Sequence, residues 1–266
     1  MPKTHIKNTE SIIIQHIELV KIEIVFHLAA SALVGNCLKN PVETFSSNIE
    51  GTWNILESCR NNKHIEAVII ASSDKAYGSA KKLPYREDTP LVGTHPYDVS
   101  KSCADLITYT YYRTYGVPAA VTRCGNIFGP GDFNFSRIIP ETIRCAVSDE
   151  ELVIRSDGKF TRDYVYVEDI VNGYIMLAEQ LKEKSLSGEA FNFSDENPIT
   201  VMKLVNNIYK LMGKKPNYTL LNKAKYEIKD QYLDSAKARK ILGWKPKKGL
   251  IKGLNNTIDW YEKYFS

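Results

Sequence analysis

A tyrosine and a lysine stand four residues apart, as Tyr97 and Lys101, in the string HPYDVSKSCADLI. On a helix this spacing places both side chains on one face, so the ammonium could lie near the phenol and lower its pKa. A phenol altered in this way can take the proton of a sugar or alcohol hydroxyl while a hydride leaves the same carbon. The same spacing also occurs on the solvated faces of ordinary helices, so the rest of the sequence decides its meaning.

A second polar cluster consists of Ser72, Ser73, Asp74 and Lys75, which directly follow the apolar run AVIIA. The hydroxyls of this cluster could hydrogen-bond to a substrate and its carboxyl could donate a proton. Its amine could act as a base if burial or a neighbouring cation lowers its pKa. A plain turn is the alternative interpretation, since Ser and Asp are common in turns.

Groups that could bind phosphate follow further along the chain. The string RCGNIFGPGD supplies Arg123, Asn126 and a glycine-rich backbone that could approach a diphosphate. A Gly/Pro turn without any ligand fits this string equally well. Arg162 in GKFTRDYVYVEDI is a further phosphate candidate, although an isolated arginine is commonly a surface residue. His27 has no carboxylate nearby in the sequence, so we expect it to pack as a strand-end histidine without a catalytic role.

Short apolar runs alternate with amphipathic stretches over the first half of the chain. We expect strands at 24–30, 67–71 and 118–122, and helices at 41–61 and 100–115, the last closed by Gly116. This alternation predicts an α/β fold, a Rossmann-like doubly wound parallel sheet. Ligands bind beyond the carboxyl ends of the strands in such sheets, and the polar clusters fall at these ends.

Beyond residue 130 the pattern is looser and predicts a smaller α/β lobe. Residues 131–266 should form mainly this lobe, interleaved with the domain of residues 1–130. Helices are expected at 136–147, 167–181, 200–212, 235–242 and 250–264, and strands at 152–154, 190–193 and 218–221.

The composition is that of a globular protein, with 43% hydrophobic and 25% charged residues in a chain of 266. The net charge of +4, from 35 basic and 31 acidic residues, is dispersed, so we expect small anionic ligands and no nucleic-acid partner. The five cysteines lack the spacing of a disulfide framework or a zinc site, which favours a cytoplasmic protein without a metal. No apolar run reaches the roughly 18 residues of a membrane span, so no membrane partner is expected.

Several strings, taken in order, carry a resemblance to a known family: EIVFHLAASALV, NPVETFSSNIEGTWNILE, VIIASSDKAYG, PYDVSKSCAD, TRCGNIFGPGD, RDYVYVEDI and LDSAKARKILGWKPKKGLIKGL. With these strings the chain resembles the extended short-chain dehydrogenase/reductase family, within its nucleotide-sugar epimerases and dehydratases. The CDP-glucose 4,6-dehydratases are the most similar group, because Lys75 follows Asp74 where the dTDP-glucose dehydratases carry an Asp-Glu pair.

The resemblance implies a lyase that keeps NAD+ bound throughout its cycle. Tyr97 would take the proton of the sugar 4-hydroxyl while Ser73 hydrogen-bonds to the reacting oxygen. Lys101 would bind the nicotinamide ribose and lower the pKa of the tyrosine. Lys75 would then act as the base at C5 while Asp74 protonates the departing 6-hydroxyl, which gives water and a 4-keto-6-deoxy sugar.

The resemblance also implies binding roles. Further cofactor contacts would come from Ala29, Ala30, Asn48 and Ser72. The nucleotide-sugar substrate would be bound by Asn126, Arg137 and Arg162. A homodimer formed through helices 42–60 and 100–115 is a further family expectation.

One feature departs from the family pattern, because the sequence lacks the turn G-x-x-G-x-x-G that approaches the cofactor pyrophosphate. Residues 1–130 would then be a partial NAD-binding domain, with 9–21 the remnant of a helix before its first strand. Either the sequence is a fragment of a complete enzyme or it is a short protein with weak cofactor affinity. Missing strands would expose a sheet edge, so we expect poor solubility or association through that edge.

Two alternative functions stay open. An NAD-dependent nucleotide-sugar 4-epimerase is the nearer one, although epimerases of the family lack an acid/base pair at the end of that strand. The second is a catalytically silent remnant that serves as an interaction module. The missing glycine-rich turn favours the remnant, whereas the presence of every side chain that the chemistry uses argues against it.

Overall fold

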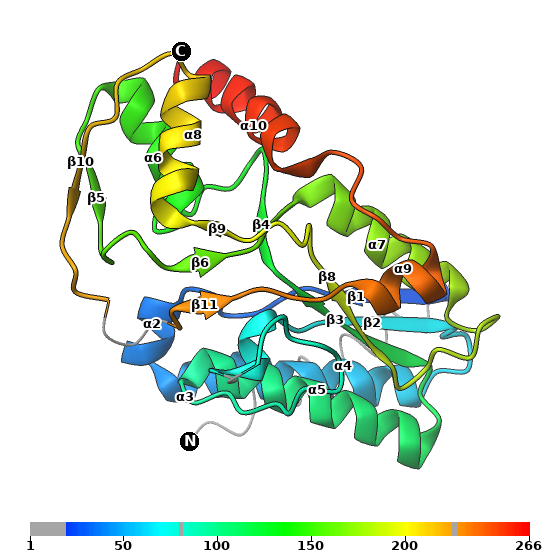
Figure 1. The fold of residues 1–266 in the computed structure, drawn as a ribbon. Helices are drawn as coiled ribbons and strands as arrows, with labels where there is room; N and C mark the ends of the chain where they lie inside the picture. The colour runs from blue at the N-terminus through cyan, green and yellow to red at the C-terminus, as the bar shows by residue number, and fades with distance from the viewer. Residues whose placement is uncertain (1–19, 80–81, 225–227) are drawn as a thin grey trace.

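A computed structural model describes residues 20–79, 82–224 and 228–266. Its main sheet has four parallel strands in the order β1-β2-β3-β8, which are Ile24–His27, Ala67–Ala71, Ala119–Cys124 and Ala190–Phe193. Helices α4 (Gly51–Arg60) and α5 (Pro96–Tyr115) cover one face, and α7 (Val167–Gln180) and α9 (Ala236–Leu242) cover the other (Figure 1). The predicted doubly wound α/β fold is therefore confirmed.

Strand β2 is continuously apolar because both faces of the sheet are covered. Val68 and Ile70 pack in the cluster that contains Leu56 of α4, whereas Ile69 packs in the cluster that contains Leu177 of α7. Alternate side chains thus enter opposite layers, as the period of two in a strand requires. The strand occupies the predicted residues 67–71.

The stretch predicted as one helix at 41–61 consists of three joined segments. Helix α3 (Pro41–Phe45) passes into a π-helical turn, Ser46–Glu50, and then into α4. The π turn ends where Gly51 weakens the helical pattern of the sequence. Such turns are rare in proteins, and those that occur are often found at functional sites. A short preceding helix, α2 (Val34–Lys39), was not predicted.

Helix α5 begins four residues earlier than the predicted start at residue 100, because Pro96 occupies its first turn. It ends at Gly116, whose φ of +70° closes the helix in the left-handed conformation. Tyr97 therefore lies in the first turn of α5, and Lys101 lies one turn further on.

The second half of the chain forms the smaller lobe and also returns to the main sheet. The predicted strand 190–193 joins the main sheet as β8, next to β3. The lobe itself contains α6 (Ile138–Ser148), α8 (Val201–Leu211), α10 (Gly249–Phe265) and the parallel pair β5 (Leu152–Ile154) and β10 (Tyr218–Leu220).

Short strands connect the two parts and escaped prediction. Strand β4 (Asn126–Phe128) pairs with β7 (Tyr164–Tyr166). Strand β6 (Thr161–Arg162) lies between β9 (Ile199–Thr200) and β11 (Asp230–Gln231), as Figure 1 shows. Strands of two or three residues have no periodicity of their own, so only their distant partners define them.

Strand β1 is an edge of the main sheet within the described residues. Ile24 and Phe26 of this strand are 42% and 40% exposed, and Leu28 just beyond it is 60% exposed. An apolar edge of this kind is a site for pairing with another strand. The expected association through this edge stays a prediction, and the proposed helix remnant at 9–21 lies almost wholly outside the described residues.

Gly173 of α7 allows close packing against β8 and the segment that follows α9. A Cβ at this position would lie 2.7 Å from the Phe193 ring and 3.1 Å from Trp244 Nε1. We expect Gly173→Ala to lower the free energy of unfolding by about 1–3 kcal/mol, measured by urea denaturation. Gly51→Ala is the control, because a Cβ there meets nothing within 4 Å and should raise that free energy by about 0.5–1 kcal/mol. Equal effects of the two changes would contradict this packing argument.

Candidate active site

The polar cluster after β2 forms a short 3₁₀ helix, η2 (Asp74–Tyr77), at the carboxyl end of that strand. Ser73 caps this helix, because its hydroxyl accepts a hydrogen bond from the Lys75 backbone N–H at 3.2 Å. The same hydroxyl donates to Asp74 Oδ1 at 3.0 Å. The cap holds the backbone of Asp74 and Lys75 in place, and the second hydrogen bond orients the Asp74 carboxyl.

Tyr97 and Lys101 of α5 face the same end of β2. The Lys101 ammonium lies 5.9 Å from the centre of the Tyr97 ring and donates to the Ala71 carbonyl at 2.7 Å. Burial lowers the pKa of Lys101 to about 8. Burial raises the pKa of Tyr97, and the hydrogen bond with Ser73 acts in the opposite direction. The sequence predicts that Lys101 lowers the pKa of Tyr97, but in the structure the effect of burial is larger and the pKa is raised. The Lys101 ammonium is hydrogen-bonded to the Ala71 carbonyl and not to the phenol.

Asp74 is buried and lies within electrostatic reach of Tyr97. Burial raises the pKa of its carboxyl, and the charges of Lys75 and Arg162 oppose that shift. Burial likewise raises the pKa of Asp98, on which Lys75 also acts. Asp74 therefore keeps its proton to a higher pH than an exposed aspartate does, and a protonated carboxyl can act as a general acid.

Gln231 is a member of this site that sequence reasoning missed. Its Oε1 accepts a hydrogen bond from Lys75 Nζ at 2.8 Å, and its side chain is fully buried. It lies on β11, in register with Arg162 of β6. The two hydrogen-bonded residues are 156 positions apart, and no motif in the sequence links them.

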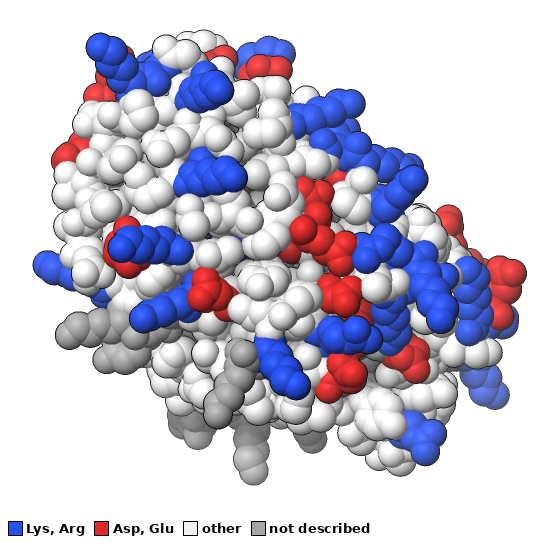
Figure 2. All heavy atoms as spheres, in the orientation of Figure 1, with Lys and Arg blue, Asp and Glu red and all other residues white. Residues whose placement is uncertain are grey.

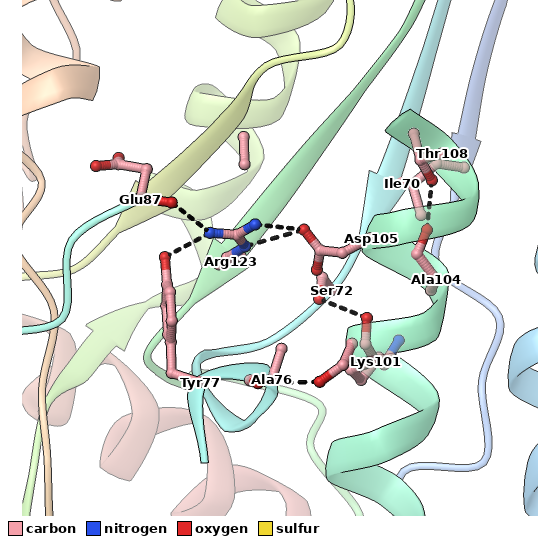
Figure 3. A network of polar contacts seen from close by, with 12 residues as sticks. Ile70, Ser72, Ala76, Tyr77, Glu87, Lys101, Ala104, Asp105, Thr108 and Arg123 are labelled. Carbon is pink, nitrogen blue, oxygen red and sulfur yellow. Dashed lines mark hydrogen bonds and ion pairs between the residues drawn. The ribbon is translucent and has the colours of Figure 1, made fainter. Parts of the chain in front are cut away.

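The residues expected on the cofactor side lie around the ends of β1 and β2. Asn48, in the π-helical turn, bonds to the backbone N–H and C=O of Ser31 and to Ser100 Oγ. This ties the loop after β1, which contains Ala29 and Ala30, to α5. Ser72 Oγ donates to the Lys101 carbonyl at 3.3 Å (Figure 3).

His27 is the last residue of β1 and is buried. Its Nε2 lies 3.4 Å from the Thr52 hydroxyl. Burial and the nearby Lys101 charge lower its pKa to about 4, so the imidazole is neutral near pH 7. Its place agrees with the prediction of a packed strand-end histidine.

The residues expected on the substrate side come from three segments. Asn126 Nδ2 donates to the Asp163 carbonyl at 3.2 Å. Arg162 is buried and donates to the Thr161 and Lys229 carbonyls, while its charge acts on Asp74. Arg137 is exposed and forms an ion pair with Asp132 at 3.0 Å, and its charge acts on Tyr97. The structure thus brings Arg137 and Arg162 near the groups expected to react.

A family model described as GDP-mannose 4,6 dehydratase matches residues 3–257. The chain belongs to this family. Among its relatives, the CDP-glucose 4,6-dehydratase of Salmonella typhimurium is 34% identical over 259 residues, which cover 92% of this chain and 72% of the relative.

Two solved structures extend the comparison of this dehydratase-family chain. The UDP-glucose 4-epimerase of Thermotoga maritima with UDP-glucose has a TM-score of 0.87 at 28% identity, covering 97% of this chain and 82% of the other. The dTDP-glucose 4,6-dehydratase of Bacillus anthracis in complex with NAD has a TM-score of 0.85 at 28% identity, covering 98% and 79%. The predicted resemblance to nucleotide-sugar dehydratases and epimerases is confirmed.

Arg123 has a structural place in this dehydratase-family chain. Its Nε and Nη2 donate to Asp105 Oδ1 at 3.0 and 2.7 Å, and its Nη1 donates to the Tyr77 hydroxyl at 2.8 Å (Figure 3). The side chain is 8% exposed. The hypothesis that Arg123 holds a diphosphate is wrong, because its donors are used inside the protein.

The charged side chains on the visible surface of the described residues are of both signs (Figure 2). On the face in Figure 2, lysines and arginines are interspersed with acidic residues, and large areas carry no charge. In the described part of the chain, no helix is long and apolar enough to cross a bilayer. No group of three or more His, Cys, Asp or Glu side chains that could hold a metal ion occurs in the same part.

Asp163 is a fully buried carboxylic acid between β6 and β7. Among the described residues neither carboxyl oxygen accepts a hydrogen bond of ordinary geometry, although the backbone N–H groups of Glu196 and Leu233 are close enough to oppose a rise in its pKa. Burial, together with the nearby Asp195 and Asp74, raises the pKa of Asp163 to about 7. In the unfolded chain an aspartate titrates near pH 3.9, so the folded state retains the proton over a wider pH range.

We expect Asp163→Asn to remove the fall in the free energy of unfolding that the buried Asp163 causes as pH rises. As pH rises from about 4 to about 7, unfolding of the wild type releases this proton, so the wild type is destabilised by about 1.4 kcal/mol per unit of pKa difference. The free energy of unfolding of the variant, relative to that of the wild type, should therefore increase from about pH 4 to about pH 7. This difference should stay constant at higher pH. Urea denaturation at pH 5 and pH 8 measures the difference, with Asp259→Asn on the exposed face of α10 as the control. A difference that does not change with pH would contradict the assignment.

Proposed function

We propose that this chain is an NAD-dependent nucleotide-sugar 4,6-dehydratase that acts on CDP-glucose. The observation that supports the proposal is at the carboxyl end of β2, where Asp74 acts electrostatically on Tyr97 and Lys75 acts on Asp74 and on Asp98, the neighbour of Tyr97. An acid and an amine at this end of the strand provide the extra proton transfers that elimination of water needs. The identity to the Salmonella CDP-glucose 4,6-dehydratase supports the choice of CDP-glucose.

The residues at the ends of β1 and β2 fit the nicotinamide end of NAD. Lys101 supplies a buried ammonium, Asn48 supplies an amide that bonds to the neighbouring Ser100, and Ser72 supplies a hydroxyl that bonds to the Lys101 backbone carbonyl. The loop of Ala29 and Ala30 has small side chains that permit close approach of a ring. NAD held by these residues would supply the hydride acceptor for C4 of the sugar and the hydride donor for C6.

Tyr97 takes the proton of the 4-hydroxyl in this proposal. Tyr97 is half-buried and its phenol is in contact with Ser73, whose hydroxyl would orient the reacting oxygen. Since burial raises the pKa of Tyr97, the phenolate needs a nearby positive charge when it forms. Lys101, 5.9 Å from the centre of the ring, and Arg137, whose charge lowers the pKa of Tyr97, supply positive charge.

Asp74 and Lys75 carry out the elimination. The 4-keto group makes the C5 hydrogen acidic, and the Lys75 amine removes it. Asp74 gives its proton to the 6-hydroxyl, which leaves as water. Burial raises the pKa of Asp74, so this carboxyl keeps its proton to a higher pH than an exposed aspartate does.

Asn126, Arg137 and Arg162 would bind the nucleotide diphosphate, with guanidinium groups as the charged donors. In this arrangement residues 1–130 form mainly the cofactor side and residues 131–266 mainly the substrate lobe. The described cysteines are all free, which supports a reducing, cytoplasmic compartment.

The reaction can be tested with the chain, NAD+ and each of CDP-glucose, dTDP-glucose and UDP-glucose. We expect a 4-keto-6-deoxy product, fastest from the CDP sugar. Lys75→Ala should lower its formation by about 100-fold or more, while reduction of bound NAD+ stays detectable by absorbance. Tyr97→Phe should abolish that reduction too, and Lys182→Ala, at an exposed position, should change neither.

Two outcomes would contradict the proposal. Inversion at C4 without loss of water would identify a 4-epimerase, like the Thermotoga maritima protein with which the fold is shared. Absence of NAD+ binding in a titration would favour an interaction module without catalysis. Elimination retained in Lys75→Ala would refute only the role of that amine.

We further propose a homodimer formed through α4 and α5, which pack side by side on one face of the sheet. Trp53, Leu106 and Tyr109 are apolar side chains on these helices with 41%, 60% and 52% exposure. Leu106→Arg should raise the dimer dissociation constant tenfold or more, as sedimentation velocity would measure. Ile251→Arg on α10 is the control, since Ile251 is 50% exposed on another surface. A wild-type monomer would contradict the proposal.

A further inference from the structure

We propose that Gln231 is a positioning residue that directs the Lys75 amine toward the sugar without favouring the charged form of that amine. This inference rests on the proposed function for its chemical meaning. The contact itself stands on geometry, because Gln231 Oε1 lies 2.8 Å from Lys75 Nζ and Gln231 is 0% exposed. A buried partner restricts a flexible lysine far more than solvent does.

The other end of the Gln231 side chain points to a ligand. Its Nε2 is buried and has no hydrogen-bond partner among the described residues. Buried amide donors in native proteins are nearly always paired, so an acceptor supplied by a bound molecule would complete this one. A sugar hydroxyl oxygen in reach of Lys75 has the required chemistry. One amide would then hold both the base and the substrate.

Charge explains why an amide suits this position. Charged groups near Lys75 include Asp74 on η2 and Asp98 on α5, and Arg162 of β6 acts on Asp74. Burial favours the neutral form of both carboxyls. A neutral acceptor at position 231 therefore fixes the amine without adding a negative charge that would stabilise the ammonium. A base at C5 must be unprotonated, so a carboxylate here would oppose the reaction.

The contact can be tested without any activity. Lysines are labelled with acetic anhydride over a range of pH, and the extent at Lys75 is read by mass spectrometry of its peptide. In Gln231→Glu the midpoint of labelling at Lys75 should move to higher pH by about one unit, because the new carboxylate favours the ammonium. Asp230→Asn, at the exposed neighbouring position of β11, should leave that midpoint in place.

Catalysis supplies the second measurement. With CDP-glucose, the rising limb of the pH profile for elimination should move upward with the labelling midpoint in Gln231→Glu. Gln231→Met, which keeps the size but removes the acceptor, should lower kcat for elimination about tenfold or more. The first reduction of NAD+ should be unchanged in both variants. A residue with only a structural role would alter stability without moving the pH profile.

The outcomes separate this inference from the proposed function. An unshifted Lys75 midpoint in folded Gln231→Glu overturns the inference, whatever the enzyme does. A shifted midpoint in a chain that does not convert CDP-glucose supports the contact and refutes the proposed reaction. If circular dichroism finds Gln231→Glu unfolded, Gln231→Asn replaces it. Its shorter side chain withdraws the acceptor, so Lys75 should be labelled faster, and an unchanged rate overturns the inference.

Discussion

The buried ion pair between Arg123 and Asp105 sets the geometry on which the candidate site depends. Arg123 lies on β3, Asp105 lies on α5 one turn after Lys101, and the Tyr77 that Arg123 also contacts ends η2. One guanidinium thus joins the helix that carries the tyrosine and lysine to the turn that carries the acid and the amine. The two halves of the site cannot shift independently while this contact persists.

The same ion pair makes the stability of the fold depend on both of its partners. Removing one partner of a buried ion pair costs about 3–5 kcal/mol, because the other charge is left without compensation. The network spreads this dependence further, since Tyr77 donates to Asn192 of β8 and Arg123 also donates to the Glu87 carbonyl. Strands β3 and β8, the turn η2 that follows β2, and α5 therefore share one set of polar contacts at the edge where the substrate would lie.

Local patterns in the sequence predicted the long elements and the order of the chemical groups. The run at 67–71 was placed correctly because both of its faces are buried, and the pairing of strand ends with polar clusters followed from the parallel sheet. Features that depend on distant partners could not be predicted. The sequence around Arg123 does not show whether this arginine binds a phosphate or Asp105. Gln231 contacts Lys75 only because β11 pairs with β6, and the sequence does not reveal that pairing.

The π-helical turn at Ser46–Glu50 has a consequence for how this chain aligns with others. A π turn accommodates one more residue than an α turn, so it acts as a single-residue insertion inside a helix. Each residue rotates a helix by about 100°, so loss of that insertion would turn the whole outward face of α4 with respect to α3. A relative with an unbroken helix would need a one-residue gap at this turn, beside Asn48, which joins the loop after β1 to α5. Without the π turn in view, a gap inside a helix would be taken for an alignment error.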